Sequence, residues 1–149
     1  EAITSDDTKI ILGTDSENMS KSRNNFINIF QEDKPLRKQV MSIETDSTLL
    51  EEPKNPDTCN VFAIYRLLAT PEQIEQMRAN YLGGNYGYGH AKQALYELIL
   101  EKFKTEREKY NYYINNLNEI DALLKKGSDK AAVIANGVLS RVRHKLGYN

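Results

Sequence analysis

Apolar residues recur every three or four positions over most of the chain beyond residue 31, and this helical period constrains the fold more than any other feature. The first stripe predicts a helix over about 34–44, with Asp33 as N-cap and Pro35 in the first turn. Residues 45–58 hold two prolines and several acidic residues, and we expect a loop there. The period restarts at Val61 and indicates a second helix.

The next boundaries are marked by caps. Thr70-Pro71-Glu72-Gln73 combines a capping hydroxyl, a proline at the first helical position and a glutamine three residues after the cap. This predicts a helix that begins at Pro71 and stops at Gly83-Gly84. The glycines and tyrosines of residues 81–89 then predict a corner between helices, with a ligand-binding loop as the alternative.

The longest amphipathic pattern runs from Ala91 to Leu117 and predicts one continuous helix. The period continues to a stop expected at Gly127, and Ser128 is expected to cap a last helix over about 131–146. Five or six helices of this kind predict an all-α fold, a helical bundle.

Residues 1–31 lack the helical period. Two short apolar runs, 9–12 and 26–30, are each consistent with a buried strand or a packed loop. Between them, residues 13–25 carry almost no apolar side chain and predict an exposed, mobile loop.

Composition excludes several classes of protein. With 149 residues, 40% apolar and 28% charged, the chain is typical of one soluble domain and not of a disordered or repetitive segment. A single cysteine, Cys59, cannot form an internal disulfide, and Cys59 with two histidines cannot supply four zinc ligands. No apolar run has a membrane-spanning length and no signal peptide is evident, so we expect a cytoplasmic protein and no bound metal.

Charge is distributed unevenly along the chain. Residues 1–90 carry 9 Lys and Arg against 14 Asp and Glu, a balance of −5, whereas residues 91–149 carry 11 against 7, a balance of +4. The C-terminal part is therefore suited to a polyanion, although solvated helix faces often show a similar excess.

A short motif lies in the polar loop. Met19-Ser20-Lys21-Ser22 matches four of the five letters of the KMSKS signature of class I aminoacyl-tRNA synthetases, with Asn18 in place of the first lysine. The residues that follow, from Arg23-Asn24-Asn25 through Thr45-Asp46-Ser47, resemble the run after this loop in the bacterial tryptophanyl-tRNA synthetase family. The loss of the lysine at Asn18 puts in question how strongly the loop holds a triphosphate.

Further segments carry the same resemblance in the same order. Cys59 to Tyr65 resembles the opening of the family's helical region, Tyr81 to Gly87 resembles its glycine-tyrosine turn, and Lys92 stands where the family has a lysine. Nothing resembles the family's HIGH-type signature or its tryptophan pocket. The chain is thus expected to be the C-terminal portion of a longer protein, and the opening residues 1–7 also suggest a fragment.

The resemblance implies that two segments of the chain have different functions. Residues 1–45 would end the catalytic domain as a short strand and loop remnant, and residues 46–149 would form an anticodon-binding helical bundle whose last helix packs back towards that domain. The whole enzyme would activate tryptophan with ATP, accompanied by Mg²⁺, and transfer it to tRNA. A homodimer is implied for the full-length protein. The alternative is a free-standing helical RNA-binding or interaction module without catalysis.

The chemistry of the loop agrees with this implication. Adenylate formation moves negative charge onto pyrophosphate, and a mobile ammonium stabilises that transition state more than it stabilises bound ATP. We therefore predict that Lys21 is catalytic. Expected ATP contacts are Asn18, Met19, Ser20, Lys21 and Ser22, with Ile10 and Ile11 as adenine contacts implied by the family or, equally, as core strand residues.

Lysine and arginine side chains on the helices are the candidates for RNA binding. The expected contacts are Lys92, Lys102 and Arg107, although intervening glutamates make ordinary intrahelical ion pairs an alternative for such residues. His90 and His144 lack a partner at the spacing of a catalytic dyad and receive no chemical role. Asp46 is expected to brace or cap the junction rather than act as an acid, and Cys59 to be buried.

Overall fold

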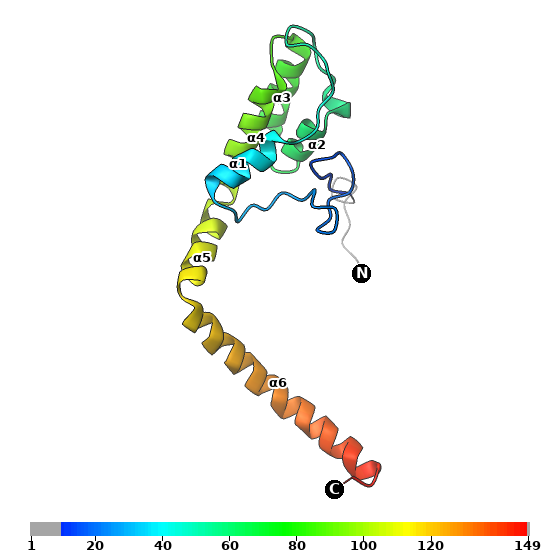
Figure 1. The fold of residues 1–149 in the computed structure, drawn as a ribbon, viewed down its shortest axis with the longest axis vertical. Helices are drawn as coiled ribbons and strands as arrows, with labels where there is room; N and C mark the ends of the chain where they lie inside the picture. The colour runs from blue at the N-terminus through cyan, green and yellow to red at the C-terminus, as the bar shows by residue number, and fades with distance from the viewer. Residues whose placement is uncertain (1–9, 149) are drawn as a thin grey trace. The chain divides into compact units, whose positions relative to one another are not determined.

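The computed structural model describes residues 10–148, so the expectations for residues 1–9 lie outside the described part of the chain. Figure 1 shows a loop segment at the start of the described chain, followed mostly by helices, and the described residues divide into two compact units within α5. Unit 1 ends at Arg107 and unit 2 begins at Glu108. The expected all-α class is confirmed for the described residues.

The helices follow one another along the chain, with a long loop over residues 42–55 between α1 and η2 and short connections elsewhere. Their bounds are α1 Asp33–Met41, the 3₁₀ helix η2 Pro56–Thr58, α2 Asn60–Arg66, α3 Pro71–Gly83, α4 Tyr88–Lys102, α5 Lys104–Asn115 and α6 Leu117–Lys145. Within residues 10–148, extended pairing is limited to one antiparallel bridge between Leu12 and Asn18. The apolar runs near 10–12 and 26–30 are therefore loops and not strands; the second packs against the core through Ile27 and Ile29, whereas Ile10 and Ile11 of the first are exposed.

Helix α4 lies at the centre of unit 1, because both α1 and α2 pack against it. The stripe predicted for α1 is buried there through Leu36 and Val40, and Phe62 of α2 and Leu95 of α4 are also almost fully enclosed. Each side chain of this kind stabilises the fold by about 1.5–3 kcal/mol through removal of apolar surface from water.

The caps predicted around α3 are confirmed. The Thr70 hydroxyl accepts from the Gln73 backbone N–H and the Gln73 side chain accepts from the Thr70 backbone N–H, which forms a capping box. The helix ends at Gly83, and Gly84 turns the chain with a φ of 71°. A Cβ at Gly84 would lie 2.5 Å from the Glu51 carbonyl oxygen, so this corner requires glycine.

The prediction of one helix from Ala91 to Leu117 is wrong at two places: α4 ends before Phe103 and α5 begins after it, and Asn116 separates α5 from α6. Phe103 packs against the core of unit 1, and Arg107, one turn later, donates to the backbone of residues 29–31. These tertiary contacts interrupt a pattern that would otherwise support a single helix.

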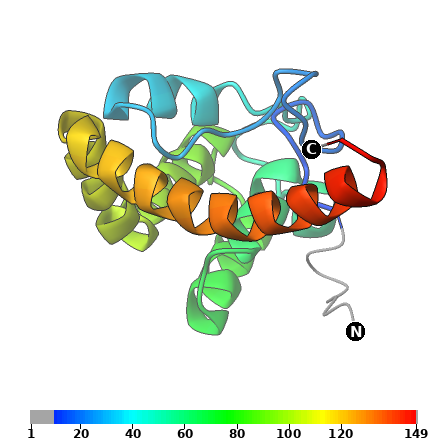
Figure 2. The ribbon, with the colours of Figure 1, turned by 90° about the horizontal axis from the view of Figure 1, so that it is seen from below.

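The stop predicted at Gly127 and the new cap at Ser128 are also wrong. Figure 2 shows α6 as one uninterrupted helix, and it runs from Leu117 to Lys145. A glycine inside a helix costs about 1 kcal/mol relative to alanine, but it ends the helix only where the chain takes up a terminating conformation. Gly127 retains helical geometry.

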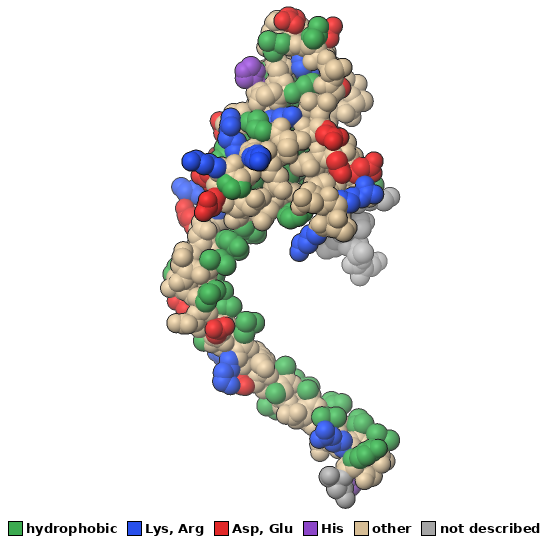
Figure 3. Space-filling model, in the orientation of Figure 1, with side chains coloured by type: hydrophobic (Ala, Val, Ile, Leu, Met, Phe, Trp, Pro, Cys, Tyr) green, Lys and Arg blue, Asp and Glu red, His purple; other side chains and the backbone are tan. Residues whose placement is uncertain are grey.

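Unit 2 has no buried residue in α6. Figure 3 shows hydrophobic side chains along its surface, and they include Leu123, Leu124, Val133, Ile134 and Val138, each between 46% and 76% exposed. Across residues 10–148, none of the helices combines the length and apolar character needed to cross a membrane.

Candidate functional site

The polar loop of residues 13–24 is held at its base by backbone hydrogen bonds. Met19 N–H donates to the Ile11 carbonyl at 2.8 Å, and Gly13 N–H donates to the Glu17 carbonyl at 2.7 Å. The loop then turns through residues 21–24, where Asn24 has a φ of 55°. The prediction of an exposed loop is confirmed for its tip, since Lys21 is exposed.

The residues of the motif differ in which of their polar groups are available to bind a ligand. The Ser20 and Ser22 hydroxyl oxygens lie 2.8 Å apart and share a hydrogen bond. The backbone N–H groups of Met19 and Ser20 already donate within the loop, to Ile11 and to the Asn25 side chain. In this arrangement the exposed Lys21 ammonium and the two hydroxyls are the groups best placed to meet an anion.

The two arms of the loop meet at Asn25, which is only 3% exposed. Its side-chain amide donates to Asp15 Oδ1 at 2.7 Å and to the Asn18 carbonyl at 3.0 Å, and its Oδ1 accepts from Ser20 N–H at 2.7 Å. The Asn25 hydrogen bond is the main reason that the pKa of Asp15 is lowered from its usual value.

Ile10 and Ile11 lie just before the loop, with 56% and 43% of their surface exposed. Ile10 and Leu12 line a cavity of about 180 Å³ together with Ala63 and Ile64 of α2 and Leu67 just after it. The two isoleucines are not enclosed core residues within the described chain, which leaves their surfaces open to further contacts.

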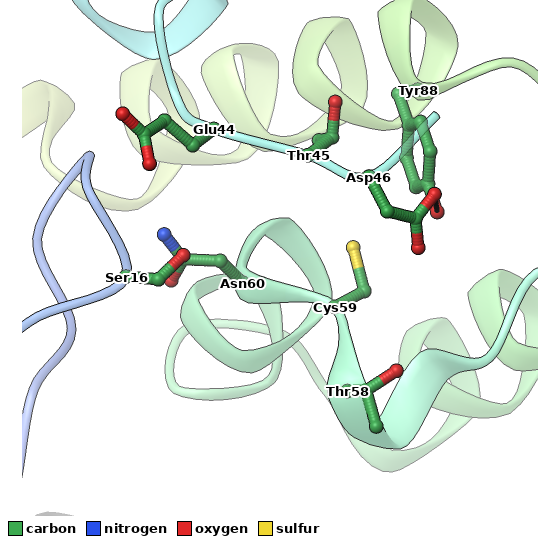
Figure 4. A pocket seen from close by; sticks show the side chains of 8 residues that line it. All are labelled: Ser16, Glu44, Thr45, Asp46, Thr58, Cys59, Asn60 and Tyr88. Carbon is green, nitrogen blue, oxygen red and sulfur yellow. Dashed lines mark hydrogen bonds between the residues drawn. The ribbon is translucent and has the colours of Figure 1, made fainter. Parts of the chain in front are cut away.

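A second cavity, of about 220 Å³, lies between the loop and the helices. Figure 4 shows Ser16 on one side of it and Tyr88 on the other, with Asn60 at the start of α2 and Cys59 just before it. The Asn60 amide donates to the Gly13 carbonyl at 2.8 Å, while its Oδ1 is buried without a protein partner. This contact ties the base of the loop to α2.

Asp46 accepts a hydrogen bond from the Tyr88 hydroxyl at 2.8 Å and from Thr48 N–H at 2.9 Å. The contacts with Thr48, followed by Tyr88, lower the pKa of Asp46, so it stays ionised as a brace. Burial, followed by the Asp46 hydrogen bond, raises the pKa of Tyr88 to about 12. The expected bracing role is therefore what the geometry supports.

Cys59 is buried, as expected, and its Sγ lies 3.4 Å from the Tyr81 hydroxyl. Among residues 10–148 no three His, Cys, Asp or Glu side chains gather into a group that could hold a metal ion.

The three expected RNA contacts lie in different environments. Lys92 donates to the Met41 carbonyl at 3.2 Å, and burial lowers its pKa. Arg107 donates to the carbonyls of Ile29 and Gln31 and forms a 2.6 Å ion pair with Asp33. Only Lys102 of the three is exposed.

Arg107 is nearly enclosed, with 14% of its side chain accessible, so its guanidinium joins α5 to the segment before α1. Lys92 similarly joins α4 to the end of α1. Lys92 and Arg107 thus each have a structural role within the chain that does not depend on RNA.

Sequence reasoning missed three polar residues that organise this region: Asn25, Asn60 and Lys54. Lys54 is 2% exposed, and its ammonium donates to the carbonyls of Leu49, Leu50 and Glu52. Nothing in the spacing of these residues sets them apart from solvated polar side chains. The one available signal is indirect. A loop without secondary structure has many backbone N–H and C=O groups that need hydrogen-bond partners, and nearby polar side chains can supply them.

No family model matches this chain. It is 45% identical over 147 residues to the tryptophan–tRNA ligase of Fusobacterium nucleatum, covering 99% of this chain and 45% of that protein. It is 39% identical over 147 residues to the tryptophan–tRNA ligase of Campylobacter jejuni, covering 99% of this chain and 46% of that protein.

Solved structures give the same result. The crystal structure of the Campylobacter jejuni tryptophanyl-tRNA synthetase matches with a TM-score of 0.89 and 40% identity, over 93% of this chain and 45% of that one. The structure of that protein complexed with ADP and tryptophan matches with a TM-score of 0.90 and 39% identity, over 99% and 46%. The chain thus spans slightly less than half the length of the relatives it matches.

Proposed function

Since the chain corresponds in sequence and fold to the C-terminal region of tryptophan–tRNA ligases, a family of class I aminoacyl-tRNA synthetases, we propose that it serves the same reaction. The whole protein activates tryptophan with ATP and transfers it to tRNA. This chain supplies the loop that closes over ATP and the helices that bind the anticodon. The match over 99% of the chain carries this proposal over a free-standing helical RNA-binding or interaction module.

Lys21 is the catalytic residue of the proposal. Its exposure at the tip of a loop whose base is fixed leaves the ammonium free to move onto the leaving pyrophosphate. Charge that meets the transition state more closely than it meets bound ATP raises the rate of the chemical step. Mg²⁺ accompanies ATP as part of the substrate.

The remaining ATP contacts come from the same loop and the residues before it. Ser20 and Ser22 use one hydroxyl proton in their mutual hydrogen bond and offer the other to a phosphate oxygen, Asn18 and Met19 complete the motif, and the open surfaces of Ile10 and Ile11 suit an adenine ring.

For tRNA, the exposure of Lys102 makes it the first candidate, with Lys92 and Arg107 as the other two. The intrachain hydrogen bonds of Lys92 and Arg107 support a role for those two side chains in holding the fold as well.

We further infer a homodimer for the full-length protein and a cytoplasmic location. The uncovered apolar stripe of α6 supports the prediction that the last helix packs back towards the catalytic domain.

The test is Lys21→Ala in the full-length protein. Loss of one preorganised charge should lower the rate of tryptophan-dependent ATP–pyrophosphate exchange by about 10²-fold or more, with a much smaller change in ATP affinity. Lys126→Ala, which removes an exposed lysine from α6, is the matched control. A near-normal pre-steady-state rate of adenylation in Lys21→Ala would refute the assignment.

Two further measurements separate the parts of the proposal. The 149-residue chain alone should show no exchange above background, because it lacks the opposite wall of the ATP site. Lys102→Ala in the full-length protein should raise the KM for tRNA and leave exchange intact, because adenylation needs no RNA. The effect should weaken as salt is raised if the contact is to phosphate.

A further inference from the structure

Asn25 is buried in a part of the chain where its neighbours are exposed. It is 3% accessible, while residues 21–24 immediately before it are all exposed. A primary amide carries two N–H donors and an oxygen acceptor, so enclosing it is costly unless these groups find partners.

Each polar group of Asn25 has a partner within the loop. The two side-chain donors meet Asp15 Oδ1 at 2.7 Å and the Asn18 carbonyl at 3.0 Å, and the side-chain oxygen meets Ser20 N–H at 2.7 Å. The backbone carbonyl of Asn25 accepts from Thr14 N–H at 2.8 Å. Asn25, at the end of the loop, therefore contacts its earlier residues at Asp15, Asn18 and Ser20 through the side chain, and at Thr14 through the backbone carbonyl.

The orientation of the amide is fixed by these partners. If the oxygen and nitrogen exchanged places, the oxygen would face a carboxylate and a carbonyl, and the NH₂ group would face the Ser20 N–H. The surroundings are also tight, because a Cβ at Gly13 would lie 2.5 Å from Asn25 Cγ. The fit leaves no room for a larger side chain at Gly13.

The base of the loop is in turn attached to the helices of unit 1. The Gly13 carbonyl accepts from the Asn60 amide at 2.8 Å, and the Thr14 carbonyl accepts from Glu44 N–H at 2.7 Å. Lys21 therefore projects from a tip whose two arms are fixed to each other by Asn25 and fixed to α2 by Asn60.

We propose that Asn25 is a positioning residue for adenylate formation, which holds the backbone of residues 14–20 in the shape from which Lys21 reaches the leaving pyrophosphate. The inference rests on the proposed function of Lys21. Asn25 does not touch the substrate, because its side-chain donors and its oxygen are used within the loop. It acts by preorganisation, since a displacement of about 1 Å at a reacting group can cost about 10²-fold in rate.

The principal variant is Asn25→Asp in the full-length protein, which keeps the shape but turns both donors into acceptors. The kcat of ATP–pyrophosphate exchange should fall by about 10-fold or more, while the KM for ATP stays within about 3-fold.

The double variant Asp15→Asn with Asn25→Asp restores one amide–carboxylate hydrogen bond with its direction reversed. It should recover part of the lost rate. Asn118→Asp, on the exposed surface of α6, is the matched control and should be silent.

A second readout distinguishes positioning from loss of fold. Transfer of tryptophan from preformed enzyme-bound adenylate to tRNA should stay near normal in Asn25→Asp, because pyrophosphate has already left. Asp15→Ala removes one partner from the loop without touching the core. It should lower the exchange kcat several-fold with the same unchanged transfer step.

The outcomes are separable. If Lys21→Ala leaves adenylation intact, the proposed function of the loop fails and this inference falls with it. If Lys21→Ala is impaired but Asn25→Asp and Asp15→Ala keep full exchange, only the inference about Asn25 is overturned. A proportional fall of exchange and transfer in both variants also overturns it, because that result indicates a purely structural role.

Discussion

Units 1 and 2 carry similar amphipathic patterns but use them differently. In unit 1 the stripes of α1, α2 and α4 meet and enclose side chains such as Leu36, Phe62 and Leu95. In unit 2 the stripe of α6 encloses nothing, and Leu124 is 65% exposed. A helical period therefore predicts a helix, whereas burial depends on whether another element faces the stripe.

The largest expected contrast is in stability. Leu95→Ala should lower the free energy of unfolding of the 149-residue chain by about 2–5 kcal/mol, because it leaves a cavity in an enclosed core. Leu124→Ala, a matched change on α6, should alter it by less than about 0.5 kcal/mol. Urea unfolding followed by circular dichroism measures both. A large loss for Leu124→Ala would show that its stripe is covered in solution.

The buried ammonium of Lys54 offers the next contrast. Lys54→Met should destabilise unit 1 by about 2–3 kcal/mol, because charged hydrogen bonds to three carbonyls are lost. Lys126→Met, which changes an exposed lysine of α6, should stay within about 0.5 kcal/mol of the parent. Equal effects in thermal unfolding would argue against the loop around Lys54 being a fixed part of unit 1.

Glycines should respond with opposite signs in the two units. Gly84→Ala is expected to cost about 1–3 kcal/mol, because it combines a positive φ with a close approach to the Glu51 carbonyl. Gly127→Ala should stabilise α6 by up to about 1 kcal/mol, because alanine is a better helix former and no atom is crowded. Stabilisation by both substitutions would contradict the corner at Gly84.

The smallest contrast concerns caps. Thr70→Ala removes half of a capping box and should cost about 1 kcal/mol. Ser128→Ala should be neutral or slightly stabilising, since Ser128 lies inside α6. A loss of helical signal confined to residues after 128 in the Ser128→Ala variant would restore the two-helix interpretation of this region.

These contrasts also explain how far sequence reasoning reaches. The boundaries of α3 were predictable because Thr70, Pro71 and Gly83-Gly84 act within one turn of the helix ends. The break at Phe103 was not, because it depends on the packing of Phe103 and on the hydrogen bonds of Arg107 to residues distant in the chain. Gly127 was misinterpreted because a glycine weakens a helix without deciding where it ends.

The candidate site divides in the same way. The motif around Lys21 could be found in the sequence, because chemistry requires particular side chains in a short run. The roles of Asn25 and Asn60 could not, because an amide reveals its function only through the backbone groups that the fold brings to it. Lys92 and Arg107 differ again. Their contact with RNA stays a prediction from charge and from the resemblance, and only the tertiary structure reveals their hydrogen bonds to carbonyls within unit 1.

The helical content, the caps of α3, the exposed loop and the resemblance to tryptophan–tRNA ligases could be predicted from the sequence, because these depend on local periodicity, short motifs and residue identity. The tertiary structure decided which stripes are covered, where the long pattern breaks and which polar residues fix the loop. These features arise from contacts between residues far apart in the chain. Their free energies depend on distance and burial in space, and no spacing along the sequence encodes them.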